Sequence, residues 1–289
     1  MNHSPLVLGL VSDVFFSAPL ENVLKASGYR AHWIERGEEI KPGETQAGPR
    51  RPGEPLTGHS ADFIALLAET QPVLVIVELS SAVIPWAEWV AALKSSAATR
   101  RIPVLAFGPH TDLDLRARAL DAGCDVVMAK SRFLADLPAL IQKYARRVDE
   151  QALAGSCAGE LSALALKGIA LFNHHEFFEA HEELEHAWNE EPGPARELYR
   201  GILQVAVAYL QITRHNYNGA LKMFLRMRQW LDPLPDTCRG VDVAQLRADA
   251  LAVKVELERL GAERLGEFDA QRLKPLRIRG LENSPTRSV

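Results

Sequence analysis

Cysteine is scarce in this sequence, and its spacing excludes two classes of small domain. The chain holds three cysteines, Cys124, Cys157 and Cys238, which are far apart and odd in number. No CxxC spacing is present, so the sequence suggests neither a disulfide scaffold nor a zinc ribbon. We therefore expect three reduced thiols, as is usual in a cytosolic protein.

The sequence also lacks an excess of positive charge and any long apolar run. Its net charge is −4 and its pI is near 6.2, which argues against a general binder of nucleic acid or anionic membranes. Only residues 272–287 are clearly basic. No apolar run reaches the roughly 18 residues of a transmembrane helix, and residues 1–10 lack the basic start of a signal peptide. We expect a cytoplasmic protein without membrane contact, and nucleic acid is not favoured as a partner.

What the sequence does have is a regular alternation of strand and helix patterns in its first half. Its 289 residues suffice for two domains of about 100–200 residues each. Short apolar runs bounded by turns predict buried strands over residues 6–11, 30–35, 72–79, 103–107 and 125–128. Helical periodicity separates these runs, which is typical of an α/β fold with a doubly wound, parallel five-stranded sheet.

The pattern changes where strand signals end and only helical periodicity continues. We expect the α/β domain over residues 1–148, a linker over 149–159 and an all-α helical bundle over 160–265. A C-terminal tail follows over 266–289. Residues 36–59 are dense in glycine, proline and charge, which predicts a flexible loop that buries too little apolar surface to offset its ordering entropy.

Three segments of the first half carry a resemblance to a known family. Residues 71–78 (QPVLVIVE), 101–108 (RIPVLAFG) and 121–130 (DAGCDVVMAK) resemble the third, fourth and fifth strands of response-regulator receiver domains. The resemblance covers about residues 5–147 and implies the flavodoxin-like receiver fold. A working receiver has a phosphoacceptor aspartate, an acidic pair for a divalent cation, a Thr or Ser, and a Lys.

This sequence departs from that pattern at the phosphorylation pocket. The resemblance puts the phosphoacceptor at Glu78 and the hydroxyl position at Gly108. The acidic pair falls on Ser12 and Asp13, which leaves one acid, and Lys130 alone is kept. One acid in place of two weakens Mg²⁺ binding. We expect a degenerate, non-phosphorylatable pseudo-receiver with Glu78 and Lys130 as a fixed ion pair, serving as an interaction or dimerisation scaffold.

The second half has its densest polar cluster in a helix over residues 175–189. At about 100° per residue, Phe177, His181, Leu184 and Trp188 form one stripe. Glu185 lies one turn beyond His181, so both are expected to face inward, with Glu182 at the margin. Inward polar groups need partners, and the following helices offer Arg200, Gln204 and Asn216.

This half resembles the helical family named domain of unknown function 309. The matching segments are residues 168–173 (GIALFN), 177–185 (FFEAHEELE), Trp188, 200–204 (RGILQ) and 216–220 (NYNGA). The resemblance implies an all-α bundle and brings no known reaction.

Three interpretations of the cluster stay open: a structural network, a small-molecule or peptide pocket, and a metal-dependent enzyme. The polar pocket would comprise His181, Glu182, Glu185, Trp188, Arg200, Gln204 and Asn216. The metal candidates are His181, Glu182 and Glu185, although the spacing is His-Glu-x-x-Glu and not the His-Glu-x-x-His of zincins. We favour a regulatory or adaptor protein without a cofactor, with a protein partner or a homodimer formed through the receiver-like domain. The alternative is a metal-dependent, hydrolase-like enzyme.

Overall fold

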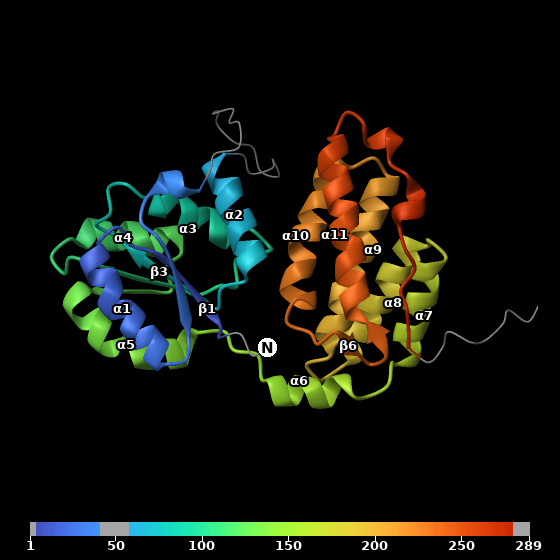
Figure 1. Ribbon diagram of the computed structural model, residues 1–289, viewed down its shortest axis with the longest axis horizontal. Coiled ribbons are helices and arrows are strands. Elements are labelled where there is room, and N and C mark those ends of the chain that lie inside the picture. The colour runs from blue at the N-terminus through green and yellow to red at the C-terminus, as the bar shows by residue number, and fades with distance from the viewer. Residues whose placement is uncertain (1–3, 41–57, 280–289) are drawn as a thin grey trace, which may run out of the picture. The chain divides into compact units, whose positions relative to one another are not determined.

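The computed structural model describes residues 4–40 and 58–279 of the chain. The chain divides into two compact units, residues 1–147 and 148–289 (Figure 1). Most of the loop expected over residues 36–59 lies outside the described residues. At its start, Gly37–Glu39 forms a short 3-10 helix.

The first unit is built on one parallel sheet. Its strands are β1 (Leu6–Leu10), β2 (Arg30–Ile34), β3 (Leu74–Glu78), β4 (Val104–Gly108) and β5 (Val126–Ala129). They lie in the order β2-β1-β3-β4-β5, and every neighbouring pair is parallel. The predicted doubly wound, five-stranded fold is confirmed, and the strand order reverses between β1 and β3.

Helices cover both faces of this sheet. The helices are α1 (Val14–Ala26), α2 (His59–Thr70), α3 (Trp86–Ser95), α4 (Leu113–Ala122) and α5 (Lys130–Tyr144). Alternate residues of β1 enter opposite cores, since Leu8 packs with Phe63 and Trp89 whereas Val7 packs with Leu20. Helices α1 and α5 therefore cover one face, and α2, α3 and α4 cover the other (Figure 1). Burial on both faces explains the continuous apolar runs in the sequence.

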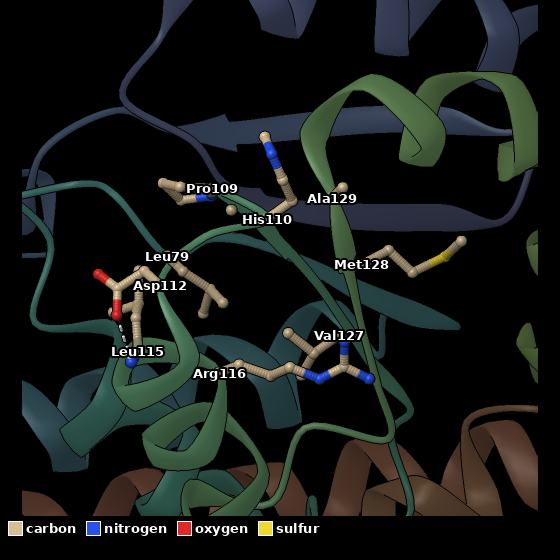
Figure 2. Close-up of a pocket in the computed structure, with 10 residues that line it drawn as sticks. Leu79, Pro109, His110, Asp112, Leu115, Arg116, Val127, Met128 and Ala129 are labelled. Carbon is tan, nitrogen blue, oxygen red and sulfur yellow. Dashed lines mark hydrogen bonds between the residues drawn. The ribbon is translucent and has the colours of Figure 1, made fainter.

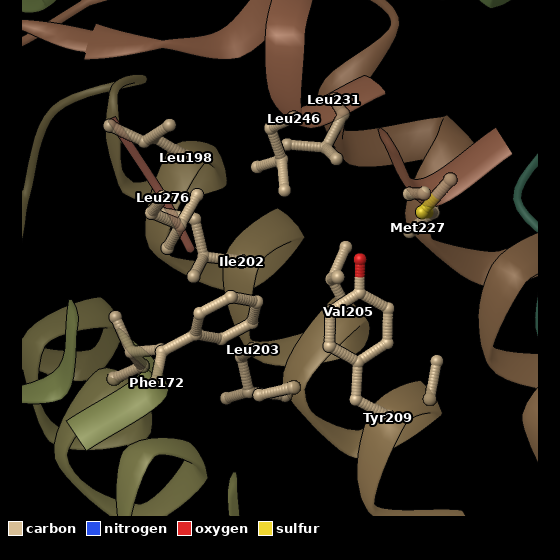
Figure 3. Close-up of a cluster of buried hydrophobic side chains, with 14 of the residues drawn as sticks. Phe172, Leu198, Ile202, Leu203, Val205, Tyr209, Met227, Leu231, Leu246 and Leu276 are labelled. Atoms are coloured by element: carbon tan, nitrogen blue, oxygen red, sulfur yellow. The ribbon is translucent and has the colours of Figure 1, made fainter. Parts of the chain in front are cut away.

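The second unit is helical, as predicted. It contains α6 (Glu150–Cys157), α7 (Ala163–Asn173), α8 (Phe177–Glu190), α9 (Arg196–Thr213), α10 (Tyr217–Leu231) and α11 (Val243–Leu260). Helix α9 is its centre, because it is buried on several sides and packs against both α8 and α10. Figure 3 shows Ile202, Val205 and Tyr209 of α9 among side chains from the surrounding elements.

Three parts of this unit differ from the sequence-based expectation. The expected linker over 149–159 contains helix α6, which Asp149 caps by accepting a hydrogen bond from the Ala152 N–H. A two-stranded hairpin of β6 (Thr237–Cys238) and β7 (Val241–Asp242) had no visible strand signal, because each strand has only two residues. The start of the expected tail is packed, and Leu276 exchanges two hydrogen bonds with the side chain of Asn173.

The expectation of three reduced thiols is wrong for two of them. Cys157 and Cys238 form a disulfide across 81 residues, and only Cys124 is free. Burial raises the pKa of the Cys124 thiol to about 12, which leaves it unreactive. Sequence spacing cannot reveal a pair that the fold brings together. The expectation of a cytoplasmic location rested partly on unpaired thiols, and this disulfide removes that support.

Candidate functional site

The first candidate site lies at the carboxyl edge of the parallel sheet. Ser12 and Asp13 follow β1, Glu78 ends β3, Gly108 ends β4, and Lys130 follows β5. Because all five strands run in one direction, their carboxyl ends meet at the same edge. The fold thus brings Ser12, Asp13, Glu78, Gly108 and Lys130 to one edge of the sheet.

Glu78 is the buried acid of this site. Its Oε2 accepts hydrogen bonds from the N–H groups of Ser12, at 2.9 Å, and Asp13, at 3.0 Å. The Ser12 hydroxyl donates to the same oxygen at 3.0 Å, and the Ser80 hydroxyl donates to Oε1 at 3.1 Å. Hydrogen bonds to a charged carboxylate replace the water it loses on burial. The Glu78 side chain, which is one methylene longer than that of an aspartate, is therefore held mainly by donors of the β1–α1 connection.

Lys130 makes its close ion pair with Asp13 and not with Glu78. Its Nζ lies 2.6 Å from Asp13 Oδ2 and 3.9 Å from Glu78 Oε1, so the expected fixed Glu78–Lys130 pair is corrected. The reason is that backbone and hydroxyl groups already occupy the Glu78 carboxylate. The hydrogen bond from Lys130 lowers the pKa of Asp13. Asp13 also caps α1 through the Phe16 N–H, which adds to the lowering.

Gly108 lines a small cavity beside the site. The cavity has a volume of about 80 Å³ and lies among β4, α4 and β5, with Leu79, Leu115 and Val127 in its wall (Figure 2). A Cβ added at Gly108 would lie 3.2 Å from the Leu79 Cβ. The position to which the receiver resemblance assigns a hydroxyl therefore adjoins the apolar side chains of Leu79 and Leu115.

The second candidate site is the polar cluster of the helical unit. The buried stripe of α8 is Phe177, Ala180, Leu184 and Ala187. His181 is half-buried beside that stripe, whereas Glu182 and Glu185 are exposed. The inward position expected for Glu185 is therefore wrong. The helical period of α8 is as predicted, but its buried face is rotated, with Ala180 and Ala187 on it in place of His181 and Trp188.

The part of the cluster that comes together lies where α8 ends and α9 begins. The Arg200 guanidinium carbon lies 4.5 Å from the ring centre of Trp188 and 3.8 Å from that of Trp230. Gln204, one turn further along α9, is only 8% exposed. Within the described part of the chain, neither Trp188 Nε1 nor Gln204 Oε1 has a hydrogen-bond partner.

Asn216 does not join this group. It caps α10 by accepting a hydrogen bond from the Gly219 N–H at 2.9 Å, and its amide donates to Gln211 Oε1 at 2.7 Å. Asn216 follows the C-terminal end of α9, and Arg200 lies in the first turns of that helix. At about 1.5 Å per residue, these positions are over about 20 Å apart. Its inclusion in the polar pocket is therefore corrected.

The metal candidates are also dispersed. Across residues 4–40 and 58–279, no three His, Cys, Asp or Glu side chains gather where they could hold a metal ion. His181, Glu182 and Glu185 therefore do not form such a group.

Sequence reasoning missed two members of the cluster. Trp230 of α10 is buried, and the Arg200 guanidinium lies over its ring. Arg196 was not singled out, although it lies one turn before Arg200 and its guanidinium is 4.9 Å from the Trp188 ring centre. The spacing of Arg196, Arg200 and Gln204 at successive turns is the signal that could have identified this face.

Comparison with known proteins agrees with the family named from the helical motifs. The model of the domain of unknown function DUF309 matches residues 165–223, which contain most of α7, all of α8 and α9, and the start of α10. His181, Glu182, Glu185, Trp188, Arg200 and Gln204 lie within the matched segment. Trp230 lies outside it.

Similar solved structures are receiver domains and cover the α/β half. A response regulator from Chloroflexus aurantiacus is 16% identical, covers 48% of this chain and 96% of its own, and has a TM-score of 0.38. The receiver domain of a sensor histidine kinase from Pseudomonas aeruginosa is 15% identical, covering 49% and 97%, with a TM-score of 0.37. An orphan response regulator of H. pylori is 19% identical, covering 50% and 100%, with a TM-score of 0.36.

No curated protein matches the chain. None of the helices in the described part of the chain is both long and apolar enough to cross a lipid bilayer.

Proposed function

We propose that this protein is a signalling-type regulatory or adaptor protein whose receiver-like unit is not phosphorylated. In this proposal the unit keeps one state and acts as a permanent module for binding a protein partner or a second copy. The hydrogen-bonded carboxylate of Glu78 is the observation that carries the proposal.

The chemistry around Glu78 supports the absence of phosphorylation. Both carboxylate oxygens accept hydrogen bonds, from Ser12, Asp13 and Ser80. A phosphoryl group added to this side chain would displace those donors inside a buried site. Gly108 supplies no hydroxyl to follow a phosphoryl group. Asp13, the remaining partner for a divalent cation, is already paired with Lys130 at 2.6 Å.

Incubation with a small phosphodonor and Mg²⁺, followed by intact-mass spectrometry, tests this proposal. We expect no stable phosphoryl adduct on the wild-type protein. The matched variant Glu78→Asp shortens the side chain by one methylene and shows whether an aspartate is modified in the same surroundings. A stoichiometric adduct on residues 1–147 of the wild type would contradict the proposal.

Exposed apolar side chains beside the same edge support a role in protein interaction. Phe15 is 94% exposed and lies two residues after Asp13, and Val14 between them is also exposed. Val83, in the connection after β3, and Leu113, at the start of α4, are likewise exposed. Apolar groups gathered around one edge are typical of a surface that a partner covers.

Replacing Phe15 by Asp tests this surface. We expect Phe15→Asp to weaken self-association or partner binding about tenfold or more, because a charge replaces an apolar contact. Light scattering across a concentration series measures self-association, and chemical crosslinking in extracts measures partner binding. The control is Phe178→Asp, which alters an exposed aromatic of the helical unit. Equal effects of the two variants would contradict the assignment of this edge.

A further inference from the structure

The cavity beside Gly108 is open to solvent and has apolar walls. Its volume is about 80 Å³, and Leu79, Leu115 and Val127 form its apolar lining (Figure 2). The exposed side chain of Arg116 also lines it, so the cavity reaches the surface. The space exists partly because Gly108 has no side chain, since an added Cβ would lie 3.2 Å from the Leu79 Cβ and 3.7 Å from Leu115 Cδ2. Protein interiors leave few such voids, so this one is a candidate for a ligand.

The volume of the cavity limits what it can hold. A water molecule takes up about 30 Å³ in the liquid, and a dry apolar cavity of about 150 Å³ accepts benzene. The cavity here has about 80 Å³. It therefore accommodates a group of about half the size of benzene, which is an alkyl chain of roughly two or three carbons. An aromatic ring, a sugar or a nucleotide base is too large for it.

A guanidinium without a partner lies at the opening of the cavity. Figure 2 shows the Arg116 side chain extending from α4 toward Val127 of β5. Across residues 4–40 and 58–279, this side chain takes part in no hydrogen bond, ion pair or ring contact. A guanidinium offers donors in a planar fork that matches the two oxygens of a carboxylate. The opening thus presents a free set of donors to an anionic group.

The nearby carboxylate of Asp112 does not neutralise this guanidinium. Asp112 and Arg116 have the spacing of a helical ion pair, but Asp112 Oδ1 instead accepts a hydrogen bond from the Leu115 N–H at 2.8 Å and caps α4. In Figure 2 the Asp112 carboxylate lies at the start of α4, whereas the Arg116 guanidinium lies beside β5. His110, which also lines the cavity, adds no negative charge. A cation therefore remains at the edge of the apolar walls.

We propose that this cavity binds a short-chain aliphatic carboxylate. The alkyl chain lies between Leu79, Leu115 and Val127, and the carboxylate accepts hydrogen bonds from the Arg116 guanidinium. The two parts of the site match the two parts of such a ligand, because the walls are apolar and the opening carries a cation. Binding requires neither a phosphorylated receiver nor a partner on the exposed apolar side chains, so the inference goes beyond the proposed function.

A series of carboxylates tests the ligand class on the full-length protein. Sodium acetate, propionate, butyrate and hexanoate are titrated at matched ionic strength, and NMR follows the methyl resonances of Leu79, Leu115 and Val127. We expect a saturable shift whose affinity rises roughly fourfold per methylene from acetate to butyrate, since each added methylene is buried. Hexanoate should gain nothing further, because its additional methylenes extend beyond the cavity. Propionamide, which lacks the charge, should bind about tenfold more weakly than propionate.

Two variants assign the shift to this cavity. Arg116→Gln should weaken propionate binding by about tenfold and leave propionamide binding unchanged, because only the charged ligand loses a partner. Gly108→Ala places a methyl group in the cavity and should weaken the binding of both ligands. The matched control is Arg118→Gln on the same helix, whose guanidinium lies over the Trp86 ring and not in the cavity wall. This control should leave both affinities unchanged.

Three results would overturn the proposal. The first is the absence of a saturable shift of the cavity methyl groups with any carboxylate of the series. The second is equal affinity for propionate and propionamide, and the third is an equal effect of Arg116→Gln and Arg118→Gln. Circular dichroism confirms that each variant is folded. If Gly108→Ala does not fold, the Arg116→Gln titration decides, because that side chain is exposed.

Discussion

At the scale of single residues, the neighbouring hydrogen-bond donors decide which partner a charged side chain takes. Lys130 faces two carboxylates and lies 2.6 Å from Asp13 but 3.9 Å from Glu78. Glu78 is satisfied by neutral donors, so the lysine pairs with the more exposed acid. The identity of a residue gives its charge, whereas the neighbouring donors determine its partner.

The Lys130–Asp13 pair predicts a change in titration. Lys130→Met removes the hydrogen bond that lowers the Asp13 pKa, so that pKa is expected to rise toward its ordinary value. Because the folded-state pKa is depressed, the pair stabilises the fold above the unfolded-state pKa. This stabilisation is lost as pH falls through the folded-state pKa. Carboxyl NMR titration measures the pKa, and Lys143→Met, at an exposed lysine, is the control. An unmoved Asp13 titration in Lys130→Met would contradict this role of the lysine.

At the scale of helices and strands, small residues and one covalent link position the elements of the helical unit. A Cβ added at Gly201 of α9 would lie 2.2 Å from Leu231 Cδ2 of α10. A Cβ at Gly168 of α7 would lie 2.7 Å from Leu184 Cγ of α8. These glycines permit the close approach of adjacent helices, and the disulfide fastens α6 to the β6–β7 hairpin.

A methyl group at the α9–α10 contact is expected to destabilise the helical unit. Gly201→Ala should lower the free energy of unfolding by about 1–3 kcal/mol, because Leu231 must leave its position. The matched control is Gly155→Ala in α6, where an added Cβ meets nothing within 4 Å. That change should be neutral or stabilising by up to about 1 kcal/mol, since alanine favours helix. Urea unfolding measures the free energy of unfolding of both variants. Equal effects would show that the close approach of α9 and α10 at Gly201 does not contribute to stability.

Removal of the disulfide is expected to destabilise the same unit. Cys238→Ser should lower the free energy of unfolding by about 2–4 kcal/mol, because the unfolded chain loses a constraint across a long loop. Reductant should lower wild-type stability and leave Cys238→Ser unchanged. In Cys124→Ala the response to reductant should persist. Wild-type stability that is insensitive to reductant, with both thiols titratable after treatment, would contradict the contribution of the bond.

At the scale of the whole molecule, each unit has its own hydrophobic core. The α/β unit buries Phe107 between Phe16 and Phe133, and the helical unit buries Phe172 against Phe177 and Tyr209. The separate cores permit the stability of the two units to be tested one at a time.

The two cores predict two unfolding transitions. Phe107→Ala should destabilise residues 1–147 by about 3–5 kcal/mol and leave the helical transition in place. Phe172→Ala should destabilise the helical unit by about 3–5 kcal/mol and leave the transition of residues 1–147 in place. Indole resonances of Trp89 and Trp188 follow each unit separately during urea unfolding. If either variant shifts both transitions equally, the two units unfold as one.

The sequence by itself determined the order of elements in the α/β unit and the residue types at the carboxyl edge of its sheet. Continuous apolar runs, without alternation of apolar and polar residues, predicted the buried parallel strands, because a strand covered on both faces needs apolar residues throughout. The residue types at single positions were also enough to show that position 108 is a glycine without a hydroxyl and that position 130 is a lysine. Each of these features depends only on residues close together in the chain.

Only the tertiary structure decided which distant groups meet. The Cys157–Cys238 bond joins residues 81 positions apart, and the Lys130–Asp13 pair joins residues 117 positions apart. Helical periodicity placed His181 and Glu185 on one side of α8, but the buried stripe runs through Ala180 and Ala187 and leaves Glu185 exposed. The fold likewise separated Asn216 from Arg200 and brought Trp230 to Arg200 instead. Periodicity fixes which residues share a face, whereas contacts between elements decide which face is buried.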